Sequence, residues 1–391
     1  MKKAKFAKVL SVIFALLMVF SAMSITVTAK TTTAQNIILM IGDGMGENSI
    51  EWTKSVYPGD YAVDTFPIKG YSKTNSYSGT TDSAAGGTAL SSGKHAFNGN
   101  LGMLALAIGD AHIDFGTYMN TCEVAKKLGK KAGVVTSDSN SGATPAAFST
   151  HVADRDYSDE ITNQQLSGSL DLIWAKANGR VNETNAAENG WAFVDSIDDI
   201  KALEENTRSF GAFTGPIEYD YNDGSFVPLS KLTELAIDQL NNEKGFFLMV
   251  EGAHIDKNNH SNNSEGMMKS MLEFDKAIDI ALDFAKEDGN TIVIVTADHE
   301  TGGIKKNSDG SFKYTSGGHT STNVPLRIYG ADDFIENGET VVNYEISRYT
   351  AKKLGYTDEY PVFNFNKNFI IDFFKSILEL NKFHPMQMPA V

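Results

Sequence analysis

The sequence predicts an α/β protein with a central, mostly parallel β-sheet flanked by helices on both faces. Two observations lead to this prediction. Short runs of continuously apolar residues, which are typical of strands covered on both faces, occur at residues 36–41, 132–136, 245–250 and 291–296. Helical segments lie between these runs, and alternating strands and helices favour a parallel sheet with right-handed crossovers.

Each expected helix carries its apolar residues on one face. Residues 229–240 and 271–285 place leucine, isoleucine, phenylalanine, methionine and alanine at helical spacing. Gly289 follows the second of these segments and suits a helix C-cap. Residues 117–127 precede Gly129 in the same way, which predicts a third helix.

Three other segments differ in composition from these elements. Residues 157–243 are rich in Asn, Asp, Gly and Ser, with Trp174 and Trp191 as isolated apolar anchors, and we expect an inserted subdomain or an elaborated connection. Residues 304–316 contain an Asp-Gly turn that predicts a hairpin. Phenylalanines within residues 363–374 suggest a packing helix.

The N-terminus has the three parts of a secretory signal peptide. Residues 1–8 are basic, residues 9–23 are apolar, and residues 27–29 end in small side chains. A membrane anchor is the alternative, but the apolar run is shorter than the ~20 residues that a span needs. We therefore expect a cleaved leader at 1–29, a single catalytic domain at 30–391 without a stable membrane anchor, and export to the periplasm, the cell-wall zone or the medium.

Composition excludes some partners and some kinds of site. The 391 residues include 34 Lys and Arg against 49 Asp and Glu, for a net charge of -15, so binding of nucleic acid through a basic surface is not expected. An anionic substrate would need local cations. Cys122 is the only cysteine, which excludes an internal disulfide and a multi-thiolate metal site, and we expect it in the core.

Metal-type ligands follow three of the predicted strands. Asp43 comes two residues after the first, Glu251 directly after the third, and Asp298 and His299 after the fourth. In open α/β sheets, ligand-binding groups gather at the carboxyl ends of the strands. We therefore expect these side chains to share one site.

The glycine turn at residues 42–46 has two alternative interpretations. A dinucleotide fingerprint needs glycines spaced G-x-G-x-x-G, and here they are spaced G-x-G-x-G. A simple turn is the second alternative. Because glycine lets the backbone come close, Asp43 between glycines could also approach two cations at once.

The segment Glu251–His260 is the richest in candidate ligands. Asp256 and His260 lie four residues apart, on one face of a helical turn, and the pair suits zinc at roughly 2.0–2.2 Å. A solvated polar loop is the alternative, and His254 is expected to be structural. Asp298 and His299 reach one metal only if the chain turns between them, and His319 lies in a glycine-rich loop.

Ser83 lies in Thr81–Ala85, just ahead of a predicted helix. A serine hydroxyl is a poor nucleophile at its free pKa and needs an activator, and the clustered Asp and His residues point to a metal. Arg155 matches phosphate oxygens bidentately, although an ordinary surface ion pair is the alternative. The other histidines, which have no comparable setting and are taken as ordinary residues, are His95, His112, His151 and His384.

Taken together, the ordered motifs at 41–46, 81–85, 250–260, 296–299 and 318–320 resemble those of bacterial alkaline phosphatases. The similarity is close over about residues 36–156 and 244–328. The resemblance implies a secreted phosphomonoesterase that acts through a phosphoserine intermediate on small phosphate monoesters, releases inorganic phosphate and forms a homodimer.

The resemblance also implies two zinc ions and one magnesium ion. Their ligands would be, in turn, Asp256, His260 and His319 for one zinc, Asp43, Asp298 and His299 for the other, and Asp43, Thr144 and Glu251 for the magnesium. Paired zinc ions ~4 Å apart clamp the attacking and leaving oxygens of an in-line displacement. Magnesium prefers hard oxygen ligands, but supply and geometry decide whether zinc or cobalt fills the paired sites.

Four further roles follow from the resemblance. Ser83 would be the nucleophile, Arg155 would clamp the phosphoryl oxygens, Lys257 would reach phosphate through water, and Asp82 would orient Arg155. The chain departs from the family at Gly142, where relatives carry Asp or His, and in lacking disulfides. We expect looser magnesium binding as a result, and tighter magnesium retention if Asp is restored at position 142.

Three other functions compete with a phosphomonoesterase. A phosphodiesterase of the same superfamily is disfavoured by the Arg155 clamp, and a sulfatase is excluded because Ser83 lacks the S-x-P-x-R context. An extracellular phosphate- or metal-binding protein without turnover should have lost some ligands, and every assigned ligand is present.

Overall fold

The computed structural model describes residues 33–108, 111–215 and 227–358. The expected signal peptide at 1–29 and the phenylalanine-rich segment 363–374 lie outside these residues. Among the residues described, no helix combines the length and the apolar character that a membrane crossing needs.

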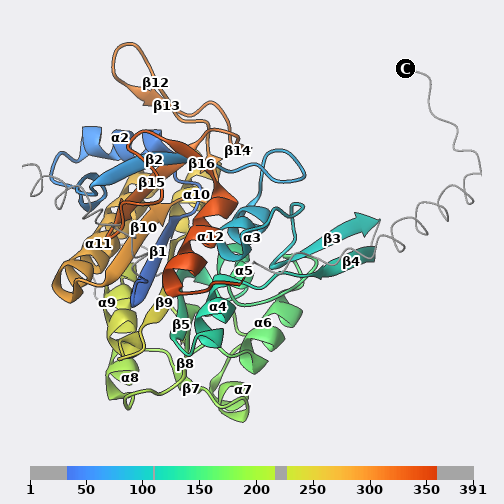
Figure 1. The fold of residues 1–391 in the computed structure, drawn as a ribbon. Helices are drawn as coiled ribbons and strands as arrows, with labels where there is room; N and C mark the ends of the chain where they lie inside the picture. Colours follow the sequence, from blue (N-terminus) through green and yellow to red (C-terminus); the bar gives the residue numbers. More distant parts are fainter. Residues whose placement is uncertain (1–32, 109–110, 216–226, 359–391) are drawn as a thin grey trace, which may run out of the picture. The chain divides into compact units, whose positions relative to one another are not determined.

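From Ala34 onward the described chain is built around a ten-stranded sheet (Figure 1). Across the sheet, the strands are β16 (Thr340–Val342), β2 (Ile68–Lys73), β15 (Val324–Tyr329), β10 (Thr291–Thr296), β1 (Asn36–Gly42), β9 (Phe246–Gly252), β5 (Lys131–Ser139), β6 (Leu172–Lys176), β8 (Ser209–Phe213) and β7 (Ala192–Val194). All four apolar runs are strands at its centre, and β10, β1, β9 and β5 pair in parallel. The predicted mostly parallel sheet is confirmed.

The strands β15 and β2 were not predicted. β15 pairs antiparallel with both β10 and β2. The chain between β10 and β15 contains no helix, and a connection without a crossover helix favours an antiparallel return. β2 is partly exposed and has no continuous apolar run, so its sequence carries little strand signal.

The helices that accompany the sheet are α2 (Glu47–Val56), α3 (Ser83–Ser92), α4 (Thr121–Lys127), α5 (Ala143–Ala147), α6 (Ser158–Ser167), α7 (Glu183–Glu188), α8 (Ile197–Ala202), α9 (Leu229–Leu240), α10 (His254–His260), α11 (Ser264–Asp288) and α12 (Asn343–Leu354), with a short 3-10 turn at Ala62–Asp64. The predicted helices are α9, α11, α4 and the helix α3 that was expected after Ser83, although α4 begins at Thr121 and not at residue 117. Gly289 ends α11 with a φ of 68°, a left-handed conformation that glycine adopts without steric cost.

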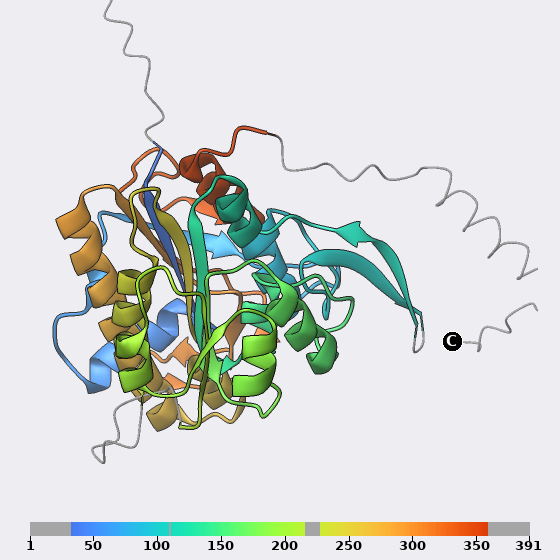
Figure 2. The same ribbon diagram turned by 90° about the horizontal axis from the view of Figure 1, so that it is seen from below.

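Helices cover both faces of the sheet, as Figure 2 shows with α9 and α11 (yellow and orange) opposite α4 and α12 (teal and red). Alternate residues of β1 enter two different hydrophobic cores. Ile38 and Met40 pack with residues of α9 and α11, whereas Ile37, Leu39 and Ile41 pack with residues of α4 and α12. This two-sided burial explains why the central strands are apolar without alternation.

The segment 157–243 continues the main sheet in the part that the structure describes. It contributes β6, β8 and β7, which extend the sheet in parallel beyond β5. Trp174 and Trp191 are buried in the same core clusters as the rest of the domain. In its described part, the segment that was expected to be an inserted subdomain or an elaborated connection extends the edge of the main sheet. Some of its polar residues cap helices, such as Asn182 for α7 and Ser196 for α8.

In the part of the chain that the structure describes, three antiparallel strand pairs lie outside the main sheet. β12 (Lys305–Lys306) pairs with β13 (Phe312–Lys313), and Gly310 between them has a φ of 88°, so the predicted hairpin is confirmed. β11 (Glu300–Thr301) pairs with β14 (His319–Thr320), which brings two predicted ligand segments together. The hairpin β3 (Met103–Ile108) and β4 (Ala111–Thr117) was not predicted.

Candidate metal centre

The carboxyl ends of β1, β9 and β10 lie side by side because their registers are aligned. Ile41 is opposite Glu251 on one side and Thr296 on the other. Asp43, Glu251 and Asp298 consequently reach the same edge of the sheet, and all three are buried. The structure thus brings together the ligands that the sequence places after separate strands.

One cluster consists of Asp43, Asp298 and His299. His299 Nε2 lies 3.5 Å from Asp43 Oδ1 and 3.3 Å from Asp298 Oδ2. The chain bends at Asp298, so the neighbouring side chains converge instead of pointing to opposite sides. The backbone N–H groups of Gly44 and His299 donate to Asp298 Oδ1 at 3.2 and 3.0 Å, which fixes the carboxylate with Oδ2 facing His299.

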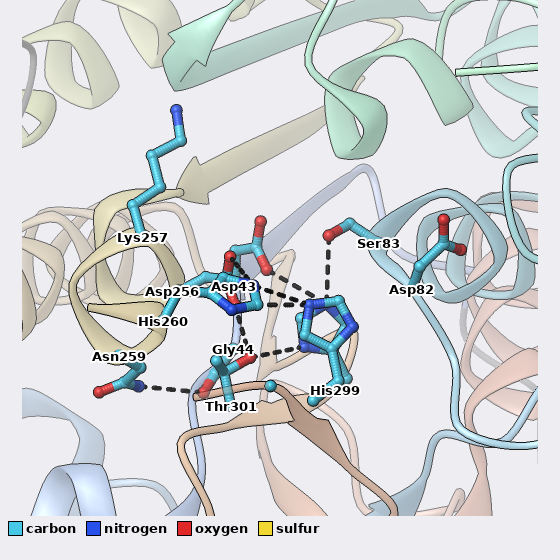
Figure 3. Close-up of polar contacts among 12 residues, drawn as sticks. Asp43, Gly44, Asp82, Ser83, Asp256, Lys257, Asn259, His260, His299 and Thr301 are labelled. Atoms are coloured by element: carbon cyan, nitrogen blue, oxygen red, sulfur yellow. Dashed lines mark hydrogen bonds and ion pairs between the residues drawn. The ribbon is translucent and has the colours of Figure 1, made fainter. Parts of the chain in front are cut away.

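A second cluster is formed by Asp256, His260 and His319 (Figure 3 shows the first two). His260 Nε2 lies 3.3 Å from Asp256 Oδ2 and 3.1 Å from His319 Nε2, while His319 Nε2 lies 3.8 Å from Asp256 Oδ1. Asp256 and His319 also form a compact group with His299. The rings of His299 and His319 are stacked with centroids 3.6 Å apart, so His299 lies beside both clusters.

Backbone carbonyls orient the two histidines of this second cluster. Nδ1 of His260 contacts the carbonyl of Gly317 at 2.8 Å, and Nδ1 of His319 contacts that of Thr81 at 2.9 Å. Because a carbonyl only accepts, each Nδ1 must carry the proton. In the neutral imidazole, each Nε2 then carries a lone pair directed at the cluster, and a bound metal would replace the Nε2 proton that His260 shares with Asp256 in the metal-free state.

Ser83 is the first residue of α3 and is buried beside the first cluster. Its Oγ lies 3.1 Å from His299 Nε2, the contact drawn in Figure 3. Asp82 caps the helix by accepting from the backbone N–H of Ala85 at 2.9 Å. The positive end of the helix dipole would favour a negatively charged oxygen on Ser83.

Arg155 is held at the same helix end. Asp82 Oδ2 accepts from Arg155 Nη1 at 3.1 Å and from the backbone N–H of Gly99 at 3.0 Å. The side chain of Arg155 keeps 36 % of its area exposed, so its remaining donors are open to a ligand. This arrangement supports the expected role of Asp82 in orienting the guanidinium.

Glu251 and Thr144, which belong to the third set of expected ligands, are both buried. The hydroxyl of Thr136 donates to Glu251 Oε2 in a short hydrogen bond. Thr144, in α5, has a buried hydroxyl without a hydrogen-bond partner. Lys257 Nζ donates to Asp138 Oδ1 at 2.5 Å. Asp138 was not predicted from the sequence, because it is one acid in a polar stretch.

The electrostatics of the site favour the binding of cations. Burial, followed by the charges of Asp298, Asp256 and Glu251, holds the pKa of Asp43 well above its usual range. Burial and then the charge of Asp138 raise the pKa of Glu251 to about 8. Buried carboxylates this close together are costly unless cations neutralise them.

The donor atoms of this region fit bound metals. Asp43 Oδ1, Asp298 Oδ2 and Thr144 Oγ1 are all buried without a hydrogen-bond partner. Although burial opposes its ionisation, hydrogen bonds from His260 and Thr301 hold the pKa of Asp256 at about 2. Mixed nitrogen and oxygen donors suit zinc at the two histidine-containing clusters, and the hydroxyl and carboxylate set around Thr144 suits magnesium.

The remaining histidines of the described chain stay outside both clusters. His95 packs against the rings of Tyr77 and Tyr344, and His151 Nε2 lies 2.9 Å from Glu123 Oε1. His112 lies 3.7 Å from Asp154. His254 begins α10 and faces the interior, and His384 is outside the described residues.

Three aromatic side chains that were not predicted from the sequence, Trp52, Phe312 and Tyr314, pack together beside the second cluster, and we call them the aromatic strap. Trp52 of α2 packs against Phe312 and Tyr314, with ring centroids 5.8 and 5.2 Å away. The hydroxyl of Tyr314 donates to Asn259 Oδ1 at 2.9 Å, and Asn259 is the residue before His260. The strap thus ties the β12–β13 hairpin to the helix that carries Asp256 and His260.

Replacing Tyr314 by phenylalanine should weaken metal binding at the second cluster by up to about tenfold. Hydrogen bonds to the metal ligands themselves typically contribute that much or more, and this bond holds the residue next to His260. The buried Asn259 Oδ1 loses its donor, which should also cost about 1 kcal/mol of stability. Competition with a zinc chelator and thermal melting measure both effects. The exposed Tyr57→Phe is the control, and an unchanged zinc affinity in Tyr314→Phe would show that the strap does not act on the cluster.

The fold and the site together define a class of α/β protein. In this class a buried serine at a helix N-terminus lies beside two clusters of candidate metal ligands, at the carboxyl edge of a mostly parallel sheet. The family model described as alkaline phosphatase matches residues 34–178 and 169–353. The chain belongs to the alkaline phosphatase family.

Curated relatives and solved structures agree with this assignment. The chain is 33% identical over 310 residues to alkaline phosphatase 3 of Bacillus subtilis (strain 168), covering 72% of this chain and 64% of that protein. It is 31% identical over 337 residues to the alkaline phosphatase of Escherichia coli (strain K12), covering 68% and 70%. The structure is similar to that of the alkaline phosphatase from the Antarctic bacterium TAB5, with a TM-score of 0.73, 30% identity, and coverage of 84% of this chain and 100% of the other. The chain spans less than two thirds of the length of the two Bacillus subtilis relatives.

Proposed function

We propose that the protein hydrolyses phosphate monoesters through a phosphoserine intermediate on Ser83. The observation that carries this proposal is the contact between Ser83 Oγ and His299 Nε2 at 3.1 Å, since His299 belongs to the first cluster and stacks on His319 of the second. A nucleophile beside two sets of metal ligands is suited to a displacement in which attacking and leaving oxygens are both stabilised.

The proposed ligand sets are those expected from the sequence. Two zinc ions would be held by Asp43, Asp298 and His299 and by Asp256, His260 and His319, and magnesium by Asp43, Thr144 and Glu251. When bound, the metals supply Lewis-acid stabilisation of the Ser83 alkoxide, the leaving oxygen and the attacking water. A TAB5 variant, solved with magnesium in a site called M3, is similar to this structure with a TM-score of 0.70 and 29% identity, covering 84% of this chain and 99% of that one, which supports a magnesium site in this fold.

The chain's own residues perform the rest of the reaction. Ser83 Oγ attacks the phosphorus atom as the bond to the alcohol oxygen breaks, which gives phosphoserine and the free alcohol. Water then attacks the phosphoserine, and inorganic phosphate leaves as the Ser83 hydroxyl is regenerated. Arg155, fixed by Asp82, binds two oxygens of the transferring group, and Lys257 contacts phosphate through water.

Hydrolysis assays distinguish this function from its alternatives. The protein should hydrolyse p-nitrophenyl phosphate far faster than bis(p-nitrophenyl) phosphate, and a chelator should abolish the reaction. Preference for the diester would indicate a phosphodiesterase. Phosphate binding without turnover of either compound would indicate a binding protein.

Arg155→Lys should raise the KM for p-nitrophenyl phosphate and the inhibition constant of inorganic phosphate by about tenfold or more. Lysine cannot form the paired hydrogen bonds of a guanidinium, and a hydrogen bond to a charged group contributes roughly 1.5–3 kcal/mol. Steady-state kinetics with phosphate as inhibitor measure both constants. Arg180→Lys is the matched control, because Arg180 also pairs with an aspartate, Asp159 at 2.7 Å, and lies outside the ligand clusters. Equal constants for the two variants would remove Arg155 from the binding site.

Export and assembly are part of the proposal. The leader-like residues 1–29 support secretion, and the family relationship supports a homodimer. Mass measurement of the exported protein would test the cleavage, and light scattering would test the dimer.

A further inference from the structure

The partner of Lys257 is a residue with no assigned role. Lys257 lies on α10, directly after Asp256, and its side chain extends away from the histidine cluster (Figure 3). Its Nζ pairs with Asp138 Oδ1 at 2.5 Å, and the two side chains keep 44 and 27 % of their areas exposed. The ion pair joins α10 to the carboxyl end of β5, the strand that leads to Thr144.

Asp138 is also connected to Glu251. The backbone N–H of Asp138 donates to Thr136 Oγ1 at 2.9 Å, and the same hydroxyl donates to Glu251 Oε2. The charge of Asp138 acts directly on Glu251. Two carboxylates that repel each other in this way favour a cation between or beside them.

The absence of a side chain at Gly142 makes room for Asp138. A Cβ built on Gly142 would lie 2.7 Å from Asp138 Oδ2 and 3.0 Å from its Cγ, which is closer than real Cβ atoms come. Gly142 has a φ of -55°, so its backbone does not require glycine. The carboxylate of Asp138 therefore occupies the space beside position 142, two residues before Thr144.

We propose that Asp138 is the positioning residue of Lys257 and supplies the outer carboxylate of the magnesium site in the space that Gly142 leaves open. The inference rests on the proposed function, which assigns magnesium to Asp43, Thr144 and Glu251. The negative charge of Asp138 raises the affinity for a divalent cation, and its hydrogen bond fixes the direction of the lysine. A half-exposed ion pair contributes little to stability, so the pair acts mainly on the site.

This geometry adds a condition to the expectation that an aspartate at position 142 tightens magnesium binding. In Gly142→Asp the new Cβ would crowd Asp138 Oδ2, so the carboxylate of Asp138 must shift, and its ion pair with Lys257 would be disturbed. An aspartate at position 142 should therefore support magnesium binding only if the carboxylate at position 138 is removed at the same time. The double variant Asp138→Ala/Gly142→Asp makes this exchange.

Magnesium titration of the zinc-loaded protein by calorimetry tests the carboxylate. Asp138→Asn, which keeps the shape and removes the charge, should raise the Kd for magnesium about tenfold. Asp138→Ala/Gly142→Asp should recover most of the affinity, whereas Gly142→Asp alone should bind no more tightly than the unmodified protein. Asp159→Asn, at a remote ion pair, is the control. Unchanged binding in Asp138→Asn, or no recovery in the double variant, would overturn the proposal.

A double-mutant cycle tests the action through Lys257. Asp138→Ala should raise the inhibition constant of inorganic phosphate several-fold, because the unrestrained lysine loses its position. At saturating magnesium, where the loss of the outer carboxylate is compensated, the same change made in a Lys257→Ala background should have no further effect. An equal effect in both backgrounds would show that Asp138 does not act through the lysine. Lack of p-nitrophenyl phosphate hydrolysis by the unmodified protein would refute the proposed function, while the magnesium titration would still report on Asp138.

Discussion

Replacing Ser83 by alanine should reduce kcat for p-nitrophenyl phosphate by at least about three orders of magnitude, the scale on which loss of a nucleophile acts. The Ser83 side chain contacts the first cluster through its Oγ, which lies 3.1 Å from His299 Nε2. Without it no phosphoserine forms. Arg155 remains in place on Asp82, so the KM should change far less than kcat.

Ser92→Ala is the matched control for this experiment. Ser92 is buried in the same helix, and its hydroxyl donates to the carbonyl of Thr88 at 2.6 Å instead of facing the ligands. This variant should retain nearly full activity. Similar rates for Ser83→Ala and the unmodified protein would remove Ser83 from the chemistry.

Removal of the metals should have the second large effect, abolishing activity and making stability dependent on pH. In the metal-free fold, burial and neighbouring charges hold the pKa of Asp43 well above its usual range and raise that of Glu251 to about 8. The folded state then keeps protons that the unfolded chain has released. Stability must therefore fall as pH rises from about 4.5, the ordinary pKa of glutamate, to about 8.

Thermal melting across this pH range, with and without chelator, measures the effect. The chelated protein should lose melting temperature as the pH rises, whereas the metal-loaded protein should show no such trend because the cations neutralise the carboxylates. Zinc and magnesium added back should restore both activity and stability. Melting curves that are the same with and without chelator at every pH would contradict a metal site among these residues.

The strand ends explain why the core of the candidate site could be read from the sequence. The apolar runs of β1, β9 and β10 fix where each strand stops, so Asp43, Glu251 and Asp298 are placed by the length of the strands themselves. The helical spacing of Asp256 and His260 works in the same way, and their side chains lie 3.3 Å apart in α10.

The parts that could not be predicted depend on contacts between distant residues. Asp138 and Lys257 are 119 positions apart in the sequence. The Asp138 carboxylate can take up its position only because Gly142 has no side chain there. The position of His299 beside both clusters follows from the pairing of β11 with β14, which are only two residues long. β15, near one edge of the sheet, is held by partners such as the Arg327–Glu47 ion pair at 2.6 Å, which no local pattern encodes.

The central claim is that phosphate is transferred to Ser83, and trapping the phosphorylated protein tests it most directly. The zinc- and magnesium-loaded protein is mixed with p-nitrophenyl phosphate, quenched in acid during turnover, digested, and examined by peptide mass spectrometry. Phosphate should be found on the peptide that contains Ser83, and should be absent from Ser83→Ala and from the chelated protein. Phosphate on a different residue, with Ser83→Ala still active, would contradict the account.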